Sequence, residues 1–333
     1  MTKLDTILQH IHNKHVYIQT HNFPDPDAIA SAFGLQQLLA YKGVSSSICH
    51  YGQIDSYSTN KMIECLGIEI TNVNIDSHTT ASDEIILVDS QKGNSNILDL
   101  DGDEIICLDH HPIFESIQYR FADIRPELGA CASMIAEYFI ENDIPIDKNT
   151  ATALLYGLKV DTANLTRSVS PLDLQMFQML YKLSDISLLE TLDHAAIKLS
   201  DLKSYANAIN SIKVFGDISF ANTGAGCPEP LIASISDFML DLAEVNFSVV
   251  YSYKDEGVKL SVRSTKALYD SGRITKAALE GFGKGGGHPA MAGGFIPYTR
   301  DDHMDAMIPS ILEMRFLKAI SEREFSDEKI LDL

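Results

Sequence analysis

Residues 21–28, HNFPDPDA, separate a short apolar run at 16–18 from an amphipathic helical pattern at 28–41. Apolar runs of four residues recur at 85–88 and 105–108, and an aspartate follows each of them directly. Runs of this kind are typical of strands that are buried on both faces of a parallel sheet. Because these runs alternate with helical patterns, we expect an α/β domain with a parallel sheet in the first half of the chain.

The later part of the chain has a different pattern. Residues 171–212 have helical periodicity and no strand signal, and a hairpin is predicted where 247–253 and 258–262 flank Asp255-Glu256-Gly257. A glycine-rich stretch at 281–294 precedes the last helical pattern. We therefore expect three parts: a first domain at 1–185, a helical linker at 186–214 and a second, smaller α/β domain at 215–333.

Composition limits the classes of partner. The 333 residues include 46 acidic and 26 basic side chains, which gives a formal net charge of −20. A field of that sign repels long polyanions such as duplex DNA, although it allows a small phosphorylated substrate. No apolar run reaches the roughly 18 residues needed to span a membrane, and the five cysteines form no CxxC pair. We expect a cytoplasmic protein with reduced thiols and no membrane partner.

Acidic and histidine residues gather where the predicted strands end. Ligands bind at the carboxyl ends of the strands in open α/β sheets, so these residues are candidates for a functional site. Clustered carboxylates need a cation to neutralise them, and a mixed Asp/His set without nearby cysteine suits Mn²⁺ or Mg²⁺ rather than structural zinc. The candidates are His21, Asp25, Asp27, Asp89, Asp109, His110, His111 and Asp161.

Single members of this set have ordinary structural explanations. Asp27 could cap the helix that follows it, and Asp89 and Asp109 could be turn residues after strands. His110 and His111 could be a solvated pair of side chains. Their joint arrival at one edge of one predicted sheet favours a metal site, and four aspartates with two histidines are enough for two ions that share one bridging carboxylate.

Four segments resemble the motifs of the DHH phosphoesterase superfamily, in the same order and spacing: HNFPDPDAIAS, LVDS, LDHHP and GLKVDTANLT. A fifth segment, GKGGGHPAMAGG, resembles the signature of the associated DHHA1 domain. The resemblance covers nearly the whole chain and is strongest to the nanoRNase and pAp-phosphatase type. It implies a DHH catalytic domain at 1–185 and a DHHA1 substrate-binding domain at 215–333.

The resemblance also implies roles for individual residues. Two divalent ions, Mn²⁺ first with Mg²⁺ or Co²⁺ as alternatives, would be held with Asp89 between them. His111 would contact the scissile phosphate or assist the leaving group, and Asp109 would orient neighbouring imidazoles. The metal ligands implied are His21, Asp25, Asp27, Asp89, His110 and Asp161.

The second domain is expected to select the substrate. Arginine suits a terminal phosphate because its fork donates two parallel hydrogen bonds, and glycine lets backbone N–H groups approach a phosphate closely. Without the resemblance, the glycine run would be interpreted as a surface loop, and Arg263 could simply pair with Glu256. Four aromatic residues could stack a base, and the sequence does not choose among Tyr253, Phe282, Phe295 and Tyr298. The expected substrate-binding residues are Arg263, Ser264, Gly286, Gly287 and His288.

Two departures from the family pattern affect the expected substrate. Proline follows the DHH triplet, at Pro112, and Leu165 stands where an aromatic residue is usual. Neither position is a predicted metal ligand. We expect a phosphodiesterase that cleaves linear dinucleotides or very short oligoribonucleotides to mononucleotides, with pGpG, a breakdown product in cyclic di-GMP signalling, slightly favoured. The alternatives are a pAp 3′-phosphatase, a general nanoRNase, a pyrophosphatase or polyphosphatase, and a nucleotide-binding relative without activity.

Other relatives fit the chain less well. RecJ-like exonucleases add an OB-type domain, and membrane-bound cyclic di-AMP phosphodiesterases carry transmembrane and sensor domains, none of which we expect here. Family II pyrophosphatases resemble the first domain but have a different second domain without the GGGH signature. Members of the family often dimerise, so a homodimer is compatible with the resemblance.

Overall fold

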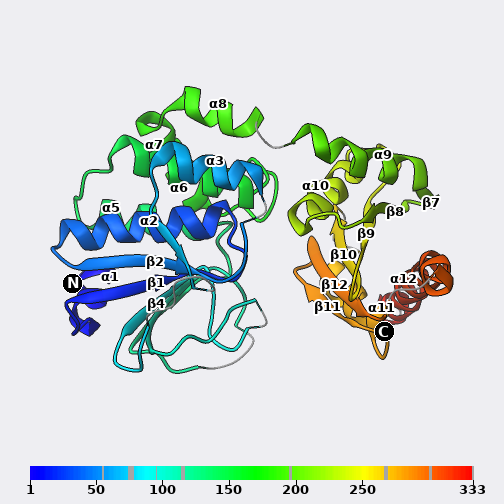
Figure 1. The fold of residues 1–333 in the computed structure, drawn as a ribbon, viewed down its shortest axis with the longest axis horizontal. Helices are drawn as coiled ribbons and strands as arrows, with labels where there is room; N and C mark the ends of the chain where they lie inside the picture. The colour runs from blue at the N-terminus through cyan, green and yellow to red at the C-terminus, as the bar shows by residue number, and fades with distance from the viewer. Residues whose placement is uncertain are drawn as a thin grey trace. The chain divides into compact units, whose positions relative to one another are not determined.

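A computed structural model describes the fold of this chain (Figure 1). The chain folds into two compact units, Met1–Ala196 and Ile197–Leu333, and each unit is described by itself. Side chains are described except for those of residues 194, 302 and 322–331. The described residues are 1–54, 56–73, 79–94, 96–113, 117–194, 197–265, 269–299 and 302–331.

The first unit contains a six-stranded sheet in which every pairing is parallel. The α/β class expected from the sequence is therefore confirmed. The strand order is β3-β2-β1-β4-β5-β6, so the direction of winding reverses between β1 and β4. Ligand sites of doubly wound sheets lie at such a reversal. The strands are β1 (His15–Gln19), β2 (Ser45–His50), β3 (Ile70–Asn72), β4 (Glu84–Val88), β5 (Asp103–Asp109) and β6 (Phe121–Ile124).

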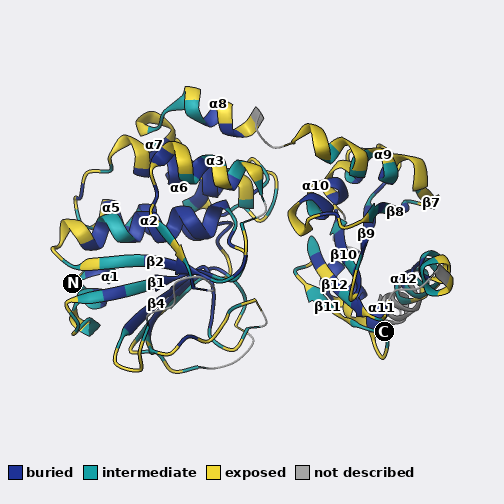
Figure 2. Cartoon of the chain, in the orientation of Figure 1, coloured by how far each residue is buried: buried dark blue, intermediate teal, exposed yellow. Residues whose placement is uncertain are grey.

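Side chains of β4 show why the apolar runs are continuous. Successive residues of a strand point to opposite faces of the sheet. Ile86 and Val88 belong to the main core cluster, whereas Ile85 and Leu87 belong to a separate cluster. All four are buried, so the strand is covered on both faces, and Figure 2 shows the middle of the sheet and most of α2 as buried.

Helices α2, α5 and α6 pack against one another over one face of this sheet (Figure 1). Their shared side chains form most of the main core cluster. The helices of the unit are α1 (Lys3–His10), α2 (Pro26–Tyr41), α3 (Tyr57–Leu66), α5 (Cys131–Glu141), α6 (Lys148–Asp161), α7 (Pro171–Leu183) and α8 (Ile186–His194).

The second unit contains a mixed sheet with the order β11-β12-β10-β9-β8-β7. The predicted hairpin is confirmed, because β9 and β10 pair antiparallel with Lys254 opposite Gly257. The glycine run is a strand, β11, paired with β12, so the alternative of a surface loop is wrong for Lys284–Gly287. The strands are β7 (Lys213–Phe215), β8 (Ile218–Ala225), β9 (Phe247–Lys254), β10 (Gly257–Ser264), β11 (Lys284–Gly287) and β12 (Met291–Pro297).

The helices of the second unit are η1 (Leu199–Asp201), α9 (Leu202–Ser211), α10 (Glu229–Leu240), α11 (Ser271–Leu279) and α12 (Asp302–Leu331). Helices α11 and α12 pack together, and their apolar side chains share a core cluster with β9, β10 and β12. Among the described residues, none of the helices combines the length and the apolar composition that a membrane span requires.

Candidate metal centre

The loop between β1 and α2 and the first turn of α2 place three of the predicted ligands. Asp25 is the N-cap of α2, and its carboxylate accepts a hydrogen bond of 3.0 Å from the backbone N–H of Ala28. The alternative in which Asp27 caps this helix is therefore wrong. Asp27 is buried instead, and it accepts hydrogen bonds from the backbone N–H groups of Cys131 at 2.7 Å and Ala132 at 3.0 Å. The N-terminus of α5 thus fixes the Asp27 carboxylate.

A glycine allows α6 to approach Asp27 closely. A Cβ atom at Gly157 would lie 2.9 Å from Asp27 Cα and 3.0 Å from its Oδ1. A side chain at this position would therefore push on the Asp27 carboxylate. The same helix ends at Asp161, which lies one helical turn beyond Gly157 on the same face.

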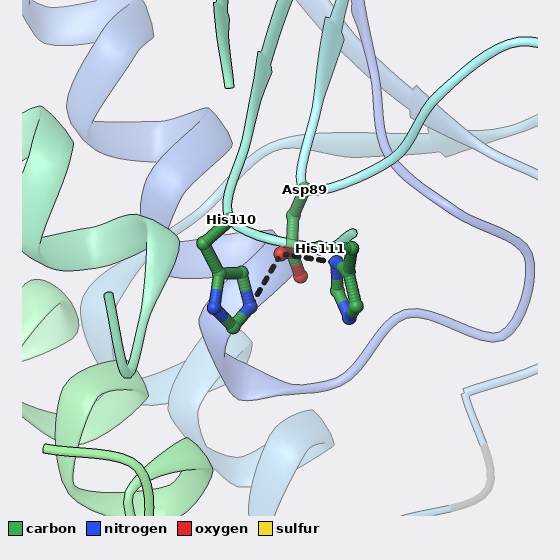
Figure 3. A group of neighbouring side chains, drawn as sticks. All are labelled: Asp89, His110 and His111. Atoms are coloured by element: carbon green, nitrogen blue, oxygen red, sulfur yellow. Dashed lines mark ion pairs between the residues drawn. The ribbon is translucent and has the colours of Figure 1, made fainter. Parts of the chain in front are cut away.

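Asp89 occupies the middle of the site, at the end of β4. Its backbone φ of +58° is unusual for a residue with a side chain, and its N–H donates to the Leu108 carbonyl at 2.8 Å. Figure 3 shows the Asp89 carboxylate between the rings of His110 and His111, which follow β5. The parallel strands β4 and β5 bring these residues to one edge of the sheet.

The two oxygens of Asp89 face two different groups of ligands. Asp89 Oδ2 lies 3.6 Å from His21 Nε2, which is 3.8 Å from Asp25 Oδ2. Asp89 Oδ1 lies 3.3 Å from His110 Nε2. On that second side, His110 Nε2 is 3.2 Å from Asp161 Oδ2 and 4.0 Å from Asp27 Oδ2. The potential ligand atoms of each group lie within 4.8 Å of one another.

Backbone carbonyls fix the tautomers of two histidines. His110 Nδ1 lies 3.1 Å from the Leu128 carbonyl, and His21 Nδ1 lies 2.9 Å from the Asn22 carbonyl. A carbonyl oxygen only accepts, so each Nδ1 carries the hydrogen. In the neutral rings each Nε2 then presents its lone pair to carboxylates, which is the arrangement of histidines that bind a metal.

Two buried polar atoms at the centre have no hydrogen-bond partner among the described residues, namely Asp89 Oδ1 and His110 Nε2. Leaving such atoms without a partner is costly, and when the His110 ring is neutral these two atoms are both acceptors, which only a proton or a cation can join across the 3.3 Å between them. A cation between them would satisfy both. The donor set of carboxylate oxygens and imidazole nitrogens fits a hard or borderline divalent ion.

Electrostatics at the site indicate the same need for a cation. Burial raises the pKa of Asp27 well above its usual range, and the nearby carboxylates of Asp89 and Asp161 raise it further. Burial alone would lower the pKa of His110, but the facing carboxylates of Asp161 and Asp89 raise it well above its ordinary value. Burial would also lower the pKa of His21, but the Asp25 carboxylate raises it to about 10. Without a metal, these side chains therefore hold protons, and a divalent ion that binds at the site would displace them.

His111 is oriented differently from the other two histidines. Its Nδ1 lies 2.8 Å from Asp109 Oδ1, and burial of the ring is outweighed by this carboxylate, which raises the pKa of His111. Asp109 is itself fully buried and accepts a hydrogen bond of 2.6 Å from Gln91 Nε2. The same amide donates to the His111 carbonyl at 3.1 Å. Gln91 therefore holds both residues, and sequence reasoning did not identify it.

The segment after Asp161 has an unusual backbone. Ala163, Asn164 and Leu165 have positive φ angles between 48° and 64°. Arg167 donates from Nη2 to the Asp161 carbonyl at 2.9 Å, which ties this turn to the ligand. Sequence analysis did not identify Arg167 either, although its position six residues after the predicted ligand Asp161 could have indicated a contact with that segment.

The predicted substrate residues of the second unit lie at one end of its sheet. Arg263 is opposite Met291 in the β10–β12 pairing, and Ser264 N–H donates to the Ala290 carbonyl at 2.9 Å. Arg263 Nε donates to Asp237 Oδ1 at 2.9 Å, so the alternative that it pairs with Glu256 is wrong.

The glycines of β11 pack closely against the start of α11. A Cβ atom at Gly272 would lie 2.0 Å from the Gly287 carbonyl oxygen, and Gly272 N–H donates to the His288 carbonyl at 3.0 Å. Gly287 has a φ of +151°. At Gly286, no atom of the described residues beyond its two chain neighbours lies within 4 Å of the position that a Cβ atom would take. Gly286 is therefore a place where a ligand could approach the backbone.

Two family models match the chain in succession. The DHH family N-terminal domain matches residues 15–158, and the DHHA1 domain matches residues 217–314. The first match contains the segments that supply His21, Asp89 and His110, and the second contains Arg263 and the glycine run.

The chain is similar to several other proteins. MJ1633, an uncharacterized protein of Methanocaldococcus jannaschii, is 33% identical over 285 residues, which are 84% of this chain and 57% of that protein. A probable manganese-dependent inorganic pyrophosphatase of Streptococcus thermophilus is 27% identical over 150 residues, or 44% of this chain and 48% of that protein. The chain thus spans about half the length of these two relatives.

Among solved structures, an exopolyphosphatase-related protein from Bacteroides fragilis is similar in fold. The TM-score is 0.78 with 17% sequence identity, and the match covers 97% of this chain and 100% of that chain. At this identity the match bears on the fold alone.

Proposed function

The chain belongs to the DHH/DHHA1 family of phosphoesterases, and we propose that it is a metal-dependent phosphodiesterase that cleaves linear dinucleotides or very short oligoribonucleotides to nucleoside monophosphates. The observation that carries this proposal is the central place of Asp89, whose two carboxylate oxygens face two separate ligand groups. A two-ion site with one bridging carboxylate requires this arrangement.

Six side chains would hold the two ions. His21, Asp25 and Asp89 form one group, and Asp27, His110 and Asp161 form the other with Asp89 shared between them. Divalent ions supply Lewis acidity and charge neutralisation to phosphate chemistry. We propose Mn²⁺ as the native ion, in line with the donor set and with the manganese-dependent pyrophosphatase relative, and Mg²⁺ or Co²⁺ as substitutes.

His111 is proposed to act on the leaving group. When the P–O ester bond breaks, the departing nucleoside oxygen needs a proton, and His111 is the imidazole whose Nδ1 is already held by Asp109. Its other ring nitrogen, Nε2, would donate that proton. Asp109 stabilises the protonated ring and Gln91 fixes Asp109, so the orientation is set before substrate binds.

The second unit is proposed to select the substrate. Arg263 would bind a terminal phosphate with its guanidinium, oriented by Asp237, and the backbone at Gly286 and Gly287 with the side chains of Ser264 and His288 would line the same subsite. Such a subsite favours a short 5′-phosphorylated nucleotide over a long chain. The negative net charge of −20 also disfavours long nucleic acid.

Among short substrates, pGpG is our first candidate. The support is the divergence from the family pattern at Pro112 and Leu165, which stand close in sequence to His111 and to the predicted ligand Asp161. Pyrophosphate is the second candidate, because a manganese-dependent pyrophosphatase is among the relatives.

Product analysis with Mn²⁺ tests the proposal. The panel contains pGpG, pApA, a five-residue RNA, pAp and pyrophosphate, and the matched control is the Asp89→Asn variant on every substrate. Conversion of pGpG alone to GMP would support a dedicated enzyme, and similar turnover of both dinucleotides would support a general nanoRNase. Turnover of pyrophosphate without any nucleoside monophosphate product would overturn the phosphodiesterase proposal.

A further inference from the structure

An aromatic ring is exposed in the loop that carries two of the candidate metal ligands. Phe23 lies between His21 and Asp25, and 57% of it is accessible to solvent. Its backbone φ is +55°, a left-handed conformation that is rarely adopted by bulky side chains. A residue that is both exposed and held in an unfavourable conformation next to a functional site suggests a functional role.

The ring is held in place by the neighbouring strand end. The N–H of Phe23 donates to the Tyr51 carbonyl at 2.8 Å, and the two rings meet edge to face with centroids 6.3 Å apart. Gly52 lies directly against the ring, because a Cβ atom there would come within 2.5 Å of it. With a fixed backbone and two contacts, the ring loses little conformational freedom when a ligand binds.

Asp25, two residues from Phe23, is the most exposed of the six candidate ligands. The Asp25 side chain is 47% exposed, whereas those of Asp89 and Asp27 are 2% and 1% exposed. Two residues of chain span at most about 7 Å, so the backbone of Phe23 lies within that distance of both His21 and Asp25. The ring is therefore within reach of a nucleoside whose phosphate lies at the metal centre.

We propose that Phe23 is a stacking platform for a base of the nucleotide whose phosphate lies at the metal centre. This inference rests on the proposed function and deepens it, because it assigns the substrate class to nucleotides rather than to inorganic phosphates. Stacking on an aromatic face tolerates any base, since every base has a π-face. It places base recognition in the first unit, at a residue outside the aromatic set considered from the sequence.

Binding measurements without turnover test the inference. AMP and ribose 5-phosphate share the sugar and the phosphate and differ in the base, so the ratio of their Kd values with Mn²⁺ isolates the base. We expect the intact protein to bind AMP roughly 5- to 150-fold more tightly than ribose 5-phosphate. In Phe23→Ala the two ligands should bind within about twofold of each other, with ribose 5-phosphate unaffected.

Three further variants sharpen the test. Phe23→Trp should keep the preference for AMP, and Phe23→Leu, which keeps apolar bulk without a π-face, should lose most of it. The control is Tyr41→Ala, which removes an exposed aromatic ring at the opposite end of α2, about 24 Å away along a 16-residue helix. This control should behave like the intact protein.

Each result bears on one of the two proposals. Absence of an AMP preference in the intact protein, or its persistence in Phe23→Ala, would overturn the stacking role. Equal weakening of both ligands by Phe23→Ala would mean that the residue only supports the loop, and would also overturn it. Turnover of pyrophosphate alone in the product assay would overturn the proposed function without changing these binding ratios.

Discussion

The metal centre of the first unit and the glycine-rich end of the second unit differ in how the chain builds them. At the candidate metal centre, side chains from four separate segments meet around the buried Asp89, and Asp89 Oδ1 and His110 Nε2 lack hydrogen-bond partners among the described residues. The glycine-rich end consists of backbone groups around Gly286 and of Arg263, whose ion-pair partner Asp237 is half exposed. We propose that metal ions complete the first arrangement, whereas the contacts of the second are made within the chain.

This difference indicates a division of labour. A buried cluster of like charges is costly, so the first unit keeps it because the chemistry depends on it. The Arg263–Asp237 ion pair is half exposed on the Asp237 side, so we expect that Arg263 can exchange this partner for a phosphate. We therefore expect large effects on turnover from changes in the first unit and moderate effects on substrate affinity from changes in the second.

Asp89→Asn should have the largest effect. The amide keeps the volume of the carboxylate but removes the charge that both ligand groups share, so turnover should fall by roughly 10³-fold or more. Steady-state kinetics on the preferred substrate, with Mn²⁺ content measured in parallel, checks this. Residual activity within about tenfold of the intact protein would show that Asp89 does not bridge two ions.

His111→Gln should come next. Loss of a general acid typically costs about 10²–10⁴-fold, and here the fall should appear in kcat rather than in KM. Substrates with a good leaving group, such as a p-nitrophenyl ester, should be affected much less because they need no proton. An equal loss on both kinds of ester would assign His111 to phosphate binding instead.

Arg263→Ala should mainly raise KM, by roughly 10- to 100-fold, for substrates with a terminal 5′-phosphate, because a charge-assisted bidentate contact is lost. Paired kinetics on pGpG and on GpG, which lacks that phosphate, measures the difference. If both substrates suffer alike, Arg263 does not bind the terminal phosphate.

The affinity of the site in the first unit for Mn²⁺ should depend on pH. Without a metal, the Asp25 carboxylate raises the pKa of His21 to about 10 in spite of burial, so this ring carries a proton at neutral pH that the ion must displace. Affinity should therefore rise with pH, by up to about tenfold per pH unit for each proton released. Calorimetric titrations in buffers of different ionisation enthalpy count those protons. A Kd that is constant between about pH 6 and pH 8 would contradict the protonated apo site.

Asp237→Ala should have the smallest effect. It removes a half-exposed partner of Arg263 and should change the melting temperature little, because the Asp237 carboxylate is already partly hydrated in the folded state. The KM for pGpG should rise by only a few-fold, since Arg263 keeps its charge but loses its orientation. A rise as large as that of Arg263→Ala would mean that orientation dominates the contact.

The sequence predicted the parallel sheet because β1, β4 and β5 are apolar runs, and the structure confirms that class. It did not predict β2, because this strand begins with three serines, of which the first is exposed and the next two are only partly buried. The candidate ligands could be predicted because each one follows a strand or a helix that has its own pattern. Gln91 could not be predicted, because its contact with Asp109 depends on how β4 and β5 pair in space.

Partner choice in the second unit shows the same limit. From the sequence, the nearby Glu256 was an alternative partner for Arg263. Glu256 lies in the turn of the hairpin, however, whereas Arg263 lies opposite Ser248 near the other end of β10. The observed partner Asp237 comes from α10, 26 positions earlier in the chain. Sequence patterns predict elements and their ends, whereas contacts between elements require the packing itself.

Anomalous diffraction from crystals grown with Mn²⁺ tests the central claim most directly. Our account predicts two peaks in the first unit, about 3.5–4 Å apart as in other two-metal sites, with one Asp89 oxygen directed to each. A single peak, or two peaks that do not share Asp89, would contradict a two-metal centre organised by this carboxylate.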